Sequence, residues 1–198
     1  MNYDVLPALA LFAFVSSVTP GPNNLMLMVS GANYGFRRTV PHMMGISVGF
    51  LVMMVLAGLG LIQVFDRYSF SYTVLKVLSV GYMLYLAWRI ANAAPIRKQT
   101  GASQPMTFLQ AAAFQWVNPK AWAMALTAIT VYVADNGPAM LGIGALFFAL
   151  VNFPSVSLWT VMGQQMARFL TNSARLRAFN WTMAALLILS LYPMLQIG

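Results

Sequence analysis

The chain has 198 residues, of which 60% are hydrophobic and 7% are charged, and it contains no cysteine. Soluble domains carry about 25% charged residues, and a soluble fold of this length cannot bury so much apolar surface. The composition therefore excludes a soluble domain, a disulfide framework and a cysteine-based metal site. The net charge of +8 comes from bases that fall mostly between apolar runs, so we interpret it as a topology signal and not as a nucleic-acid interface.

Six apolar runs predict six transmembrane helices. The segment MNYDVLPALA has no basic stretch and no small-residue cleavage site, so we expect the first run to stay as a membrane helix and not to be a cleaved signal peptide. A spanning helix needs about 20 mostly apolar residues. The runs that satisfy this length lie at about 5–32, 41–65, 70–90, 108–134, 139–167 and 178–196.

Two of these runs contain a polar step broken by proline. VTPGPNN (Val18–Asn24) interrupts the first run, and VNPKAW (Val117–Trp122) interrupts the fourth. Such breaks are costly, because each unpaired backbone group in lipid costs several kcal/mol. Pro20 and Pro119 lie 99 positions apart, which is half the length of the chain. Matched breaks in two halves are typical of the substrate site of a transporter.

The spacing also predicts an internal repeat. A second, weaker match joins PHMMGI (Pro41–Ile46) to PAMLGI (Pro138–Ile143). We expect one all-α integral-membrane transporter domain over 1–198, with repeat 1 at about 1–93, a cytoplasmic linker at about 94–105 and repeat 2 at about 106–198. Each repeat holds three helices, so the second enters the membrane from the opposite side and the two repeats are inverted.

The first break has the residues of a helix start. Thr19 is the expected N-cap, Pro20 or Pro22 suits the first helical turn, and Gly21 lets the chain turn. The backbone N–H groups of residues 23–25 would then lack partners, with the positive end of a helix dipole behind them. Such a helix start favours an anionic group, and a substrate carboxylate is the natural candidate.

The second break repeats this pattern and adds a charge. Asn118 is the expected N-cap, Pro119 suits the first turn, and Lys120 is an ionisable residue inside a span. Gln115 lies about one turn earlier and is expected to line the same cavity. Two alternatives stay open: each proline could simply kink its helix, and Lys120 could extend to the membrane surface.

The charges predict the orientation. Eight bases fall on one side of the six spans: Arg37, Arg38, Arg89, Arg97, Lys98, Arg168, Arg175 and Arg177. The other side carries Arg67, Lys76 and the three acids, Asp4, Asp66 and Asp135. By the positive-inside rule the eight-base side is cytoplasmic, so both termini are expected in the periplasm.

A few further residues leave alternatives open. His42 could handle protons, although an ordinary interfacial histidine is the simpler interpretation. Asn152 could join the site or bond a neighbouring helix. Gly45 and Gly49 form a GxxxG pattern, which predicts close helix packing within a protomer or in a homodimer. No acid lies well inside a span, so the sequence leaves the coupling ion open.

Several of these segments together resemble one known family. TPGPNN, the following GFRRT, GISVGF, LKVLSVGYMLYLAWRI and FQWVNPKAW resemble the LysE/RhtB superfamily of bacterial amino-acid exporters, and the similarity covers nearly the whole chain. Within the superfamily the chain looks most like the cysteine/O-acetylserine and the homoserine/threonine exporters. The resemblance implies an inner-membrane secondary transporter that exports amino acids or their derivatives, driven by protons or by the membrane potential, without cofactor or metal.

Carried over position by position, the resemblance and the two motifs assign one set of residues to substrate binding. The set comprises Thr19, Pro20, Gly21, Pro22, Asn23, Asn24, Gln115, Asn118, Pro119 and Lys120. Three other functions compete with export: a channel, a structural or assembly membrane protein, and an intramembrane enzyme. The enzyme is disfavoured, because one histidine, no cysteine and no buried acid cannot form a catalytic dyad or a metal cluster.

Overall fold

The computed structural model describes residues 3–68, 70–93, 104–133 and 138–192, and the regular structure within these ranges is helical, without a strand. The all-α prediction is therefore confirmed for the described residues. Most of the linker predicted at 94–105 lies outside them.

The first half of the chain runs from a short 3-10 turn to the long helix α5. Its elements are η1 (Tyr3–Val5), α1 (Leu6–Val18), α2 (Pro22–Tyr34), α3 (Phe36–Leu56), the π-helical η2 (Ala57–Leu61), α4 (Ile62–Arg67) and α5 (Phe70–Ala91). Two glycines turn the chain in the left-handed region that other residues rarely adopt. Gly35, at φ 78°, ends α2 and starts α3, and Gly60, at φ 123°, kinks the chain between α3 and α4.

The second half is broken early and then continues in two uninterrupted helices. Its elements are α6 (Phe108–Phe114), the 3-10 turn η4 (Gln115–Val117), α7 (Pro119–Thr127), the π-helical η5 (Ala128–Val133), α8 (Pro138–Met166) and α9 (Ser173–Leu189). Thr107 starts α6 through a capping box with Gln110. Asn172 starts α9 by accepting a hydrogen bond from the Arg175 N–H at 2.8 Å.

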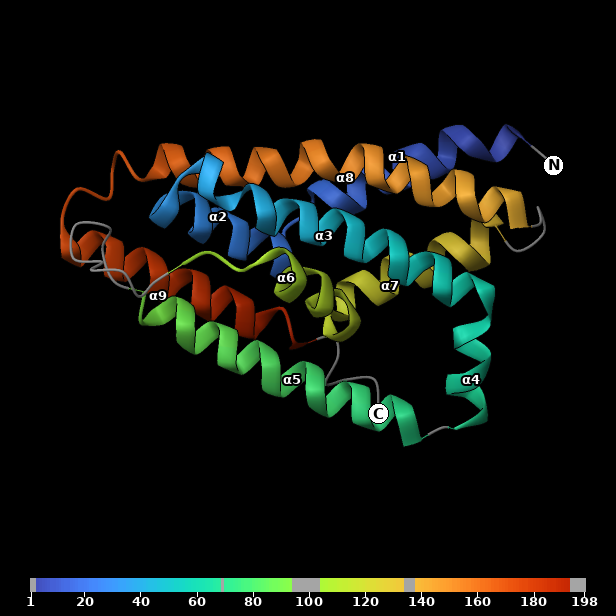
Figure 1. The fold of residues 1–198 in the computed structure, drawn as a ribbon. Helices are drawn as coiled ribbons and strands as arrows, with labels where there is room; N and C mark the ends of the chain where they lie inside the picture. Colours follow the sequence, from blue (N-terminus) through green and yellow to red (C-terminus); the bar gives the residue numbers. More distant parts are fainter. Residues whose placement is uncertain (1–2, 69, 94–103, 134–137, 193–198) are drawn as a thin grey trace.

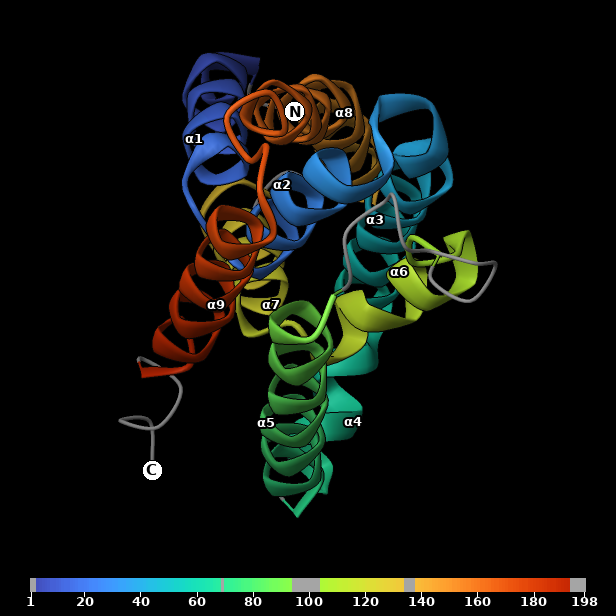
Figure 2. The same ribbon diagram turned by 90° about the vertical axis from the view of Figure 1, so that its left-hand side faces the viewer.

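The helices form an elongated bundle (Figure 1). The long helix α8 packs along α1, α2 and α3, and α5 packs against α9. Figure 2, which looks along the bundle from one end, shows α2 lying between α8 and the pair formed by α9 and α7. Glycines permit the closest approaches, since Gly31 of α2 meets the backbone of Thr160 and Gly163 of α8 meets the backbone of Met28.

Within the part of the chain that the structure describes, three helical stretches are long and apolar enough to cross a membrane: Phe36–Arg67, Phe70–Ala91 and Ala139–Met166. The apolar helix α1 is shorter, because the first break ends it at Val18. Two of the predicted boundaries were wrong. Helix α3 includes Pro41 and begins at Phe36, where Gly35 makes the turn, and α9 begins at Ser173, where Asn172 is the cap.

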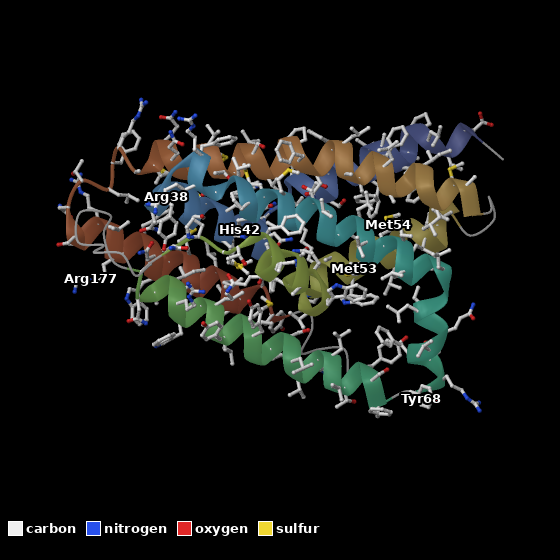
Figure 3. All side chains as sticks on the ribbon, in the orientation of Figure 1. Arg38, His42, Met53, Met54, Tyr68 and Arg177 are labelled. Carbon is white, nitrogen blue, oxygen red and sulfur yellow. The ribbon has the colours of Figure 1, made fainter. Side chains whose placement is uncertain are left out.

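The charged groups separate along the bundle. Arg38 and Arg177 lie at one end, which we call the basic end, and Tyr68 lies at the other (Figure 3). Asp66 and Arg67 immediately precede Tyr68, and Asp66 accepts a hydrogen bond from the Tyr72 hydroxyl at 2.6 Å. Arg97 and Lys98 lie outside the described residues.

The GxxxG glycines are used within the chain. A side chain at Gly45 would collide with Phe108 and Ala111, and one at Gly49 would collide with Ala112. Both glycines therefore hold α6 against α3. Of the two alternatives for this GxxxG pattern, packing within the protomer is the one observed, because α6 of the same chain covers both glycines.

Candidate functional site

Both predicted breaks interrupt helices at their prolines. Helix α1 ends at Val18 and α2 begins at Pro22, while η4 ends at Val117 and α7 begins at Pro119. Asn118 caps α7 as predicted, because its side-chain oxygen accepts a hydrogen bond from the Lys120 N–H at 3.1 Å. Pro22 and Pro119 occupy the first helical turn, where the missing N–H group costs nothing.

The prediction for Thr19 was wrong. Gly21, with extended backbone, is the N-cap of α2, and no side chain caps this helix. The Thr19 hydroxyl instead donates to the Ser16 carbonyl at 3.0 Å, because Pro20 and Gly21 separate Thr19 from the helix start and leave it over the last turn of α1. The N–H group of Leu25 is also paired, since it donates to the Gly21 carbonyl at 3.0 Å.

The two breaks contact each other directly. Asn23 and Gln115 exchange side-chain hydrogen bonds: the Asn23 Nδ2 donates to the Gln115 Oε1 at 2.8 Å, and the Gln115 Nε2 donates to the Asn23 Oδ1 at 3.3 Å. Lys120 crosses to the other break, where its Nζ donates to the Thr19 carbonyl at 2.6 Å, to the Thr19 hydroxyl at 3.0 Å and to the Pro20 carbonyl at 3.4 Å. Residues about half a chain apart thus form one polar junction.

Side-chain donors satisfy the carbonyls that the first break frees. The Asn24 Nδ2 donates to the Ser17 carbonyl at 2.9 Å and to the Thr19 carbonyl at 2.8 Å. The indole of Trp159, on α8, donates to the Val18 carbonyl at 3.1 Å. A helix end away from water needs such partners, because unpaired carbonyls there are costly. The break is therefore a stable feature of the fold, supported by side chains from three elements.

A cavity lies at this junction. Its polar lining from the predicted set consists of Gly21, Asn23, Asn24, Gln115, Asn118 and Lys120. Thr19 and Pro20 do not border the cavity, but their carbonyls accept hydrogen bonds from Lys120, which does. Pro22 and Pro119 start the adjoining helices and do not border the cavity either. Asn152 of α8 also lines the cavity. The sequence interpretation had left that role open beside simple helix packing.

Ser17 is a lining residue that the sequence analysis missed. It is 4% exposed, it borders the cavity, and its hydroxyl has no hydrogen-bond partner among the residues that the structure describes. The signal lay in the serine pair Ser16–Ser17 one turn before the break. Phe50 and Met124 supply apolar walls that no motif indicated.

The cavity is lined by a positive charge. Lys120 is the one charged side chain among the described lining residues, and all the other polar groups are neutral amides or hydroxyls. An ammonium among amide and hydroxyl groups, next to a helix start, suits a carboxylate, because the two can form charge-assisted hydrogen bonds. The amide and carbonyl oxygens of the same junction are acceptors of the kind that suits the amine of a zwitterion.

Comparison with known proteins identifies the family. The model of the LysE type translocator family matches residues 14–191. The chain belongs to the LysE type translocator family. The resemblance recognised in its motifs is therefore confirmed. Members of this family are transporters and not enzymes, so the intramembrane enzyme is excluded.

Named relatives of this LysE-type chain are bacterial efflux proteins. It is 29% identical over 193 residues to the cysteine/O-acetylserine efflux protein of Klebsiella pneumoniae, with 95% of each chain covered. It is 28% identical over 200 residues to the protein of that name in Escherichia coli K12 and in Shigella sonnei, with 95% of this chain and 96% of the relative covered. No solved structure matches the chain.

Proposed function

We propose that this LysE-type translocator exports small neutral amino acids or their derivatives, of the cysteine and O-acetylserine type, from the bacterial cytoplasm across the inner membrane. The observation that carries the proposal is the ammonium of Lys120, which reaches from one broken helix to the carbonyls of the other in a polar cavity that holds no other described charge. The full-length similarity to cysteine/O-acetylserine efflux proteins supports this substrate class.

In the proposed site the ten residues of the two motifs act in four ways. Lys120, Asn23 and Gln115 contact the substrate, because their polar atoms border the cavity. Gly21, Asn24 and Asn118 stabilise the helix ends around the substrate. Gly21 is the N-cap of α2, Asn24 donates to a freed carbonyl of α1, and Asn118 accepts from the first turn of α7. Thr19 and Pro20 hold the lysine through their carbonyls until a substrate carboxylate takes their place. Pro22 and Pro119 fix the starts of the two half-helices.

The cavity at this site is small in the described conformation. Its volume of about 30 Å³ leaves room for only a few water molecules, each of which needs roughly 10–15 Å³. An amino acid enters only if the junction parts, and breaking the Lys120–Thr19 and Asn23–Gln115 contacts is the smallest change that parts it. We therefore propose that substrate binding exchanges these internal hydrogen bonds for substrate hydrogen bonds as the two breaks separate.

We further propose six spans in two inverted repeats, which together form one transporter domain. The packing supports this architecture, because each repeat packs a long helix on the broken helix of the other repeat. Helix α8 of the second repeat packs on α1 and α2 of the first, and α3 of the first repeat packs on α6 and α7 of the second. If α1–α2 corresponds to α6–α7 and α3 corresponds to α8, the two sets of contacts are equivalent. Inverted repeats of this kind support alternating access around a central site.

The proposed orientation places the basic end in the cytoplasm and both termini in the periplasm. It is supported by Arg37, Arg38, Arg168, Arg175 and Arg177, which are exposed around the ends of α2 and α8 and the start of α9. Protons or the membrane potential drive export in this proposal. A homodimer would have to use an outward face such as that of Gly81 or Gly142, because α6 covers Gly45 and Gly49.

Transport in reconstituted vesicles tests the proposed function. Proteoliposomes that contain the purified chain should take up radiolabelled O-acetylserine when a proton gradient or a membrane potential is imposed, and unlabelled cysteine should compete. Protein-free liposomes treated in the same way are the control. Uptake no faster than in the empty vesicles, with every imposed gradient, would contradict export by this chain.

A further inference from the structure

A second cavity lies nearer the basic end of the bundle, away from the junction of the two breaks. It has a volume of about 70 Å³ and is lined by Ser30 and Tyr34 of α2, His42 of α3, Arg89 of α5 and Met106 before α6, among others. Asn24 lines the central cavity and Ser30 this one, six residues further along α2. At a rise of about 1.5 Å per residue the two cavities are separated by roughly 9 Å along that helix.

His42 is a buried polar side chain whose hydrogen bonds are not made within the described part of the protein. It is 1% exposed, it borders the second cavity, and neither ring nitrogen has a hydrogen-bond partner among the described residues. The nearby hydroxyls are committed elsewhere, since those of Ser30 and Thr39 share a hydrogen bond at 2.8 Å. An imidazole buried without partners is costly, so its nitrogens are suited to a molecule that occupies the cavity.

Arg89 brings a positive charge to the same cavity. It is exposed, and its guanidinium lies over the ring of Tyr85 at 6.0 Å from the centroid. The chain contains three acids. Asp4 and Asp66 are on the elements of the opposite end, and Asp135 is outside the described residues. The guanidinium therefore has no described carboxylate partner, and its planar fork suits the carboxylate of a ligand.

We infer that this second cavity captures the carboxylate of the amino acid before the substrate reaches the central junction. Arg89 at the mouth attracts and pairs with the carboxylate, and the His42 ring, which carries one donor and one acceptor when neutral, bonds the polar groups that follow it inward. The inference rests on the proposed function, because it takes the exported amino acid as the ligand. It adds a capture site, hereafter the His42–Arg89 site, which neither sequence motif includes.

Transport kinetics of two variants test the His42–Arg89 site. Arg89→Gln and His42→Gln each leave a neutral side chain that can still form hydrogen bonds. The control, Arg38→Gln, removes an exposed arginine from the same end of the bundle that does not line the cavity. In phosphatidylcholine proteoliposomes with radiolabelled O-acetylserine, each of the first two should raise KM by about tenfold, the loss expected for one hydrogen bond to a charged group. Their maximal rate should stay within about twofold of the wild type, and Arg38→Gln should leave both parameters unchanged.

The outcomes separate this inference from the proposed function. If the wild type transports O-acetylserine while Arg89→Gln leaves KM unchanged, the capture site is refuted and export stands. If Arg38→Gln raises KM as much as Arg89→Gln does, a diffuse surface charge is responsible and the site is also refuted. An effect of Arg89→Gln that appears only when phosphatidylglycerol is added would identify a lipid phosphate as the ligand and overturn the inference. Size-exclusion profiles of the purified variants show whether each is folded, and Arg89, which is exposed, provides the test if His42→Gln is not.

Discussion

We expect the Lys120→Met variant to lose export almost completely while still inserting in the membrane. Methionine keeps the length and the apolar stem of lysine, but it removes the one described charge of the central cavity. Removing one partner of a desolvated, hydrogen-bonded charge pair costs about 2–5 kcal/mol, so the transport efficiency for O-acetylserine should fall at least about 30-fold. Initial uptake rates in proteoliposomes measure this loss.

Two further variants show whether the charge itself is responsible. Lys120→Arg keeps the charge with a different shape and should retain part of the activity. Arg67→Met removes an exposed charge at the end of the bundle opposite the basic end, outside the central cavity, and should transport like the wild type. If Lys120→Met transports normally, the lysine only satisfies the Thr19 and Pro20 carbonyls, and the assignment of the substrate site to this junction fails.

The second large effect is expected at Gly163, where α8 meets α2. A β-carbon at this position would come closer to the backbone of Met28 than real side chains approach, and Gly31 faces Thr160 across the same contact. Backbone cannot move aside as a flexible side chain can, so Gly163→Ala must separate the two helices. We expect a loss of at least about 3 kcal/mol of stability, at the upper end of overpacking effects.

Gly142 provides the matched control on the same helix. No atom of the described residues lies within 4 Å of a β-carbon at this position, so Gly142→Ala should be neutral or slightly stabilising, because alanine favours the helix more than glycine does. Thermal unfolding of the detergent-purified variants, followed by fluorescence-detected size exclusion, compares the two. Equal melting temperatures for Gly163→Ala and Gly142→Ala would show that α2 and α8 do not pack as described.

Local chemistry made the helix breaks predictable. Pro22 and Pro119 lack an N–H group and therefore mark helix starts, and the Asn118 side chain reaches its own helix, so both features follow from a few adjacent residues. The GxxxG pattern likewise predicted close packing from a few adjacent residues, but it could not predict which helix would pack against the two glycines. Helix α6 does so, from a position distant in the sequence.

The partners of the breaks could not be predicted, because they come from distant parts of the chain. Thr19 has the residue type of an N-cap, yet Gly21 takes the cap position. The Thr19 carbonyl accepts from Asn24 nearby and from Lys120, which lies 101 residues away. From the sequence, Trp159 is predicted to be a packing residue. In the structure its indole donates a hydrogen bond to the Val18 carbonyl. His42 shows no pattern that separates an interfacial histidine from one buried without partners.

The chain's lack of cysteine allows a direct measurement at the junction. In a Ser17→Cys variant the new thiol replaces the unpartnered hydroxyl in the cavity with almost the same shape. Its reaction rate with 2-aminoethyl methanethiosulfonate is measured in proteoliposomes with and without O-acetylserine, which has no thiol of its own. Ser173→Cys, at the exposed start of α9, is the control.

A substrate held between the two broken helices must shield residue 17. The rate at Ser17→Cys should fall with O-acetylserine concentration in proportion to the occupied fraction, while the rate at Ser173→Cys stays constant. Adding Lys120→Met to Ser17→Cys should remove the protection. A labelling rate at Ser17→Cys that saturating O-acetylserine does not change, in a variant that still transports it, would show that the substrate binds elsewhere.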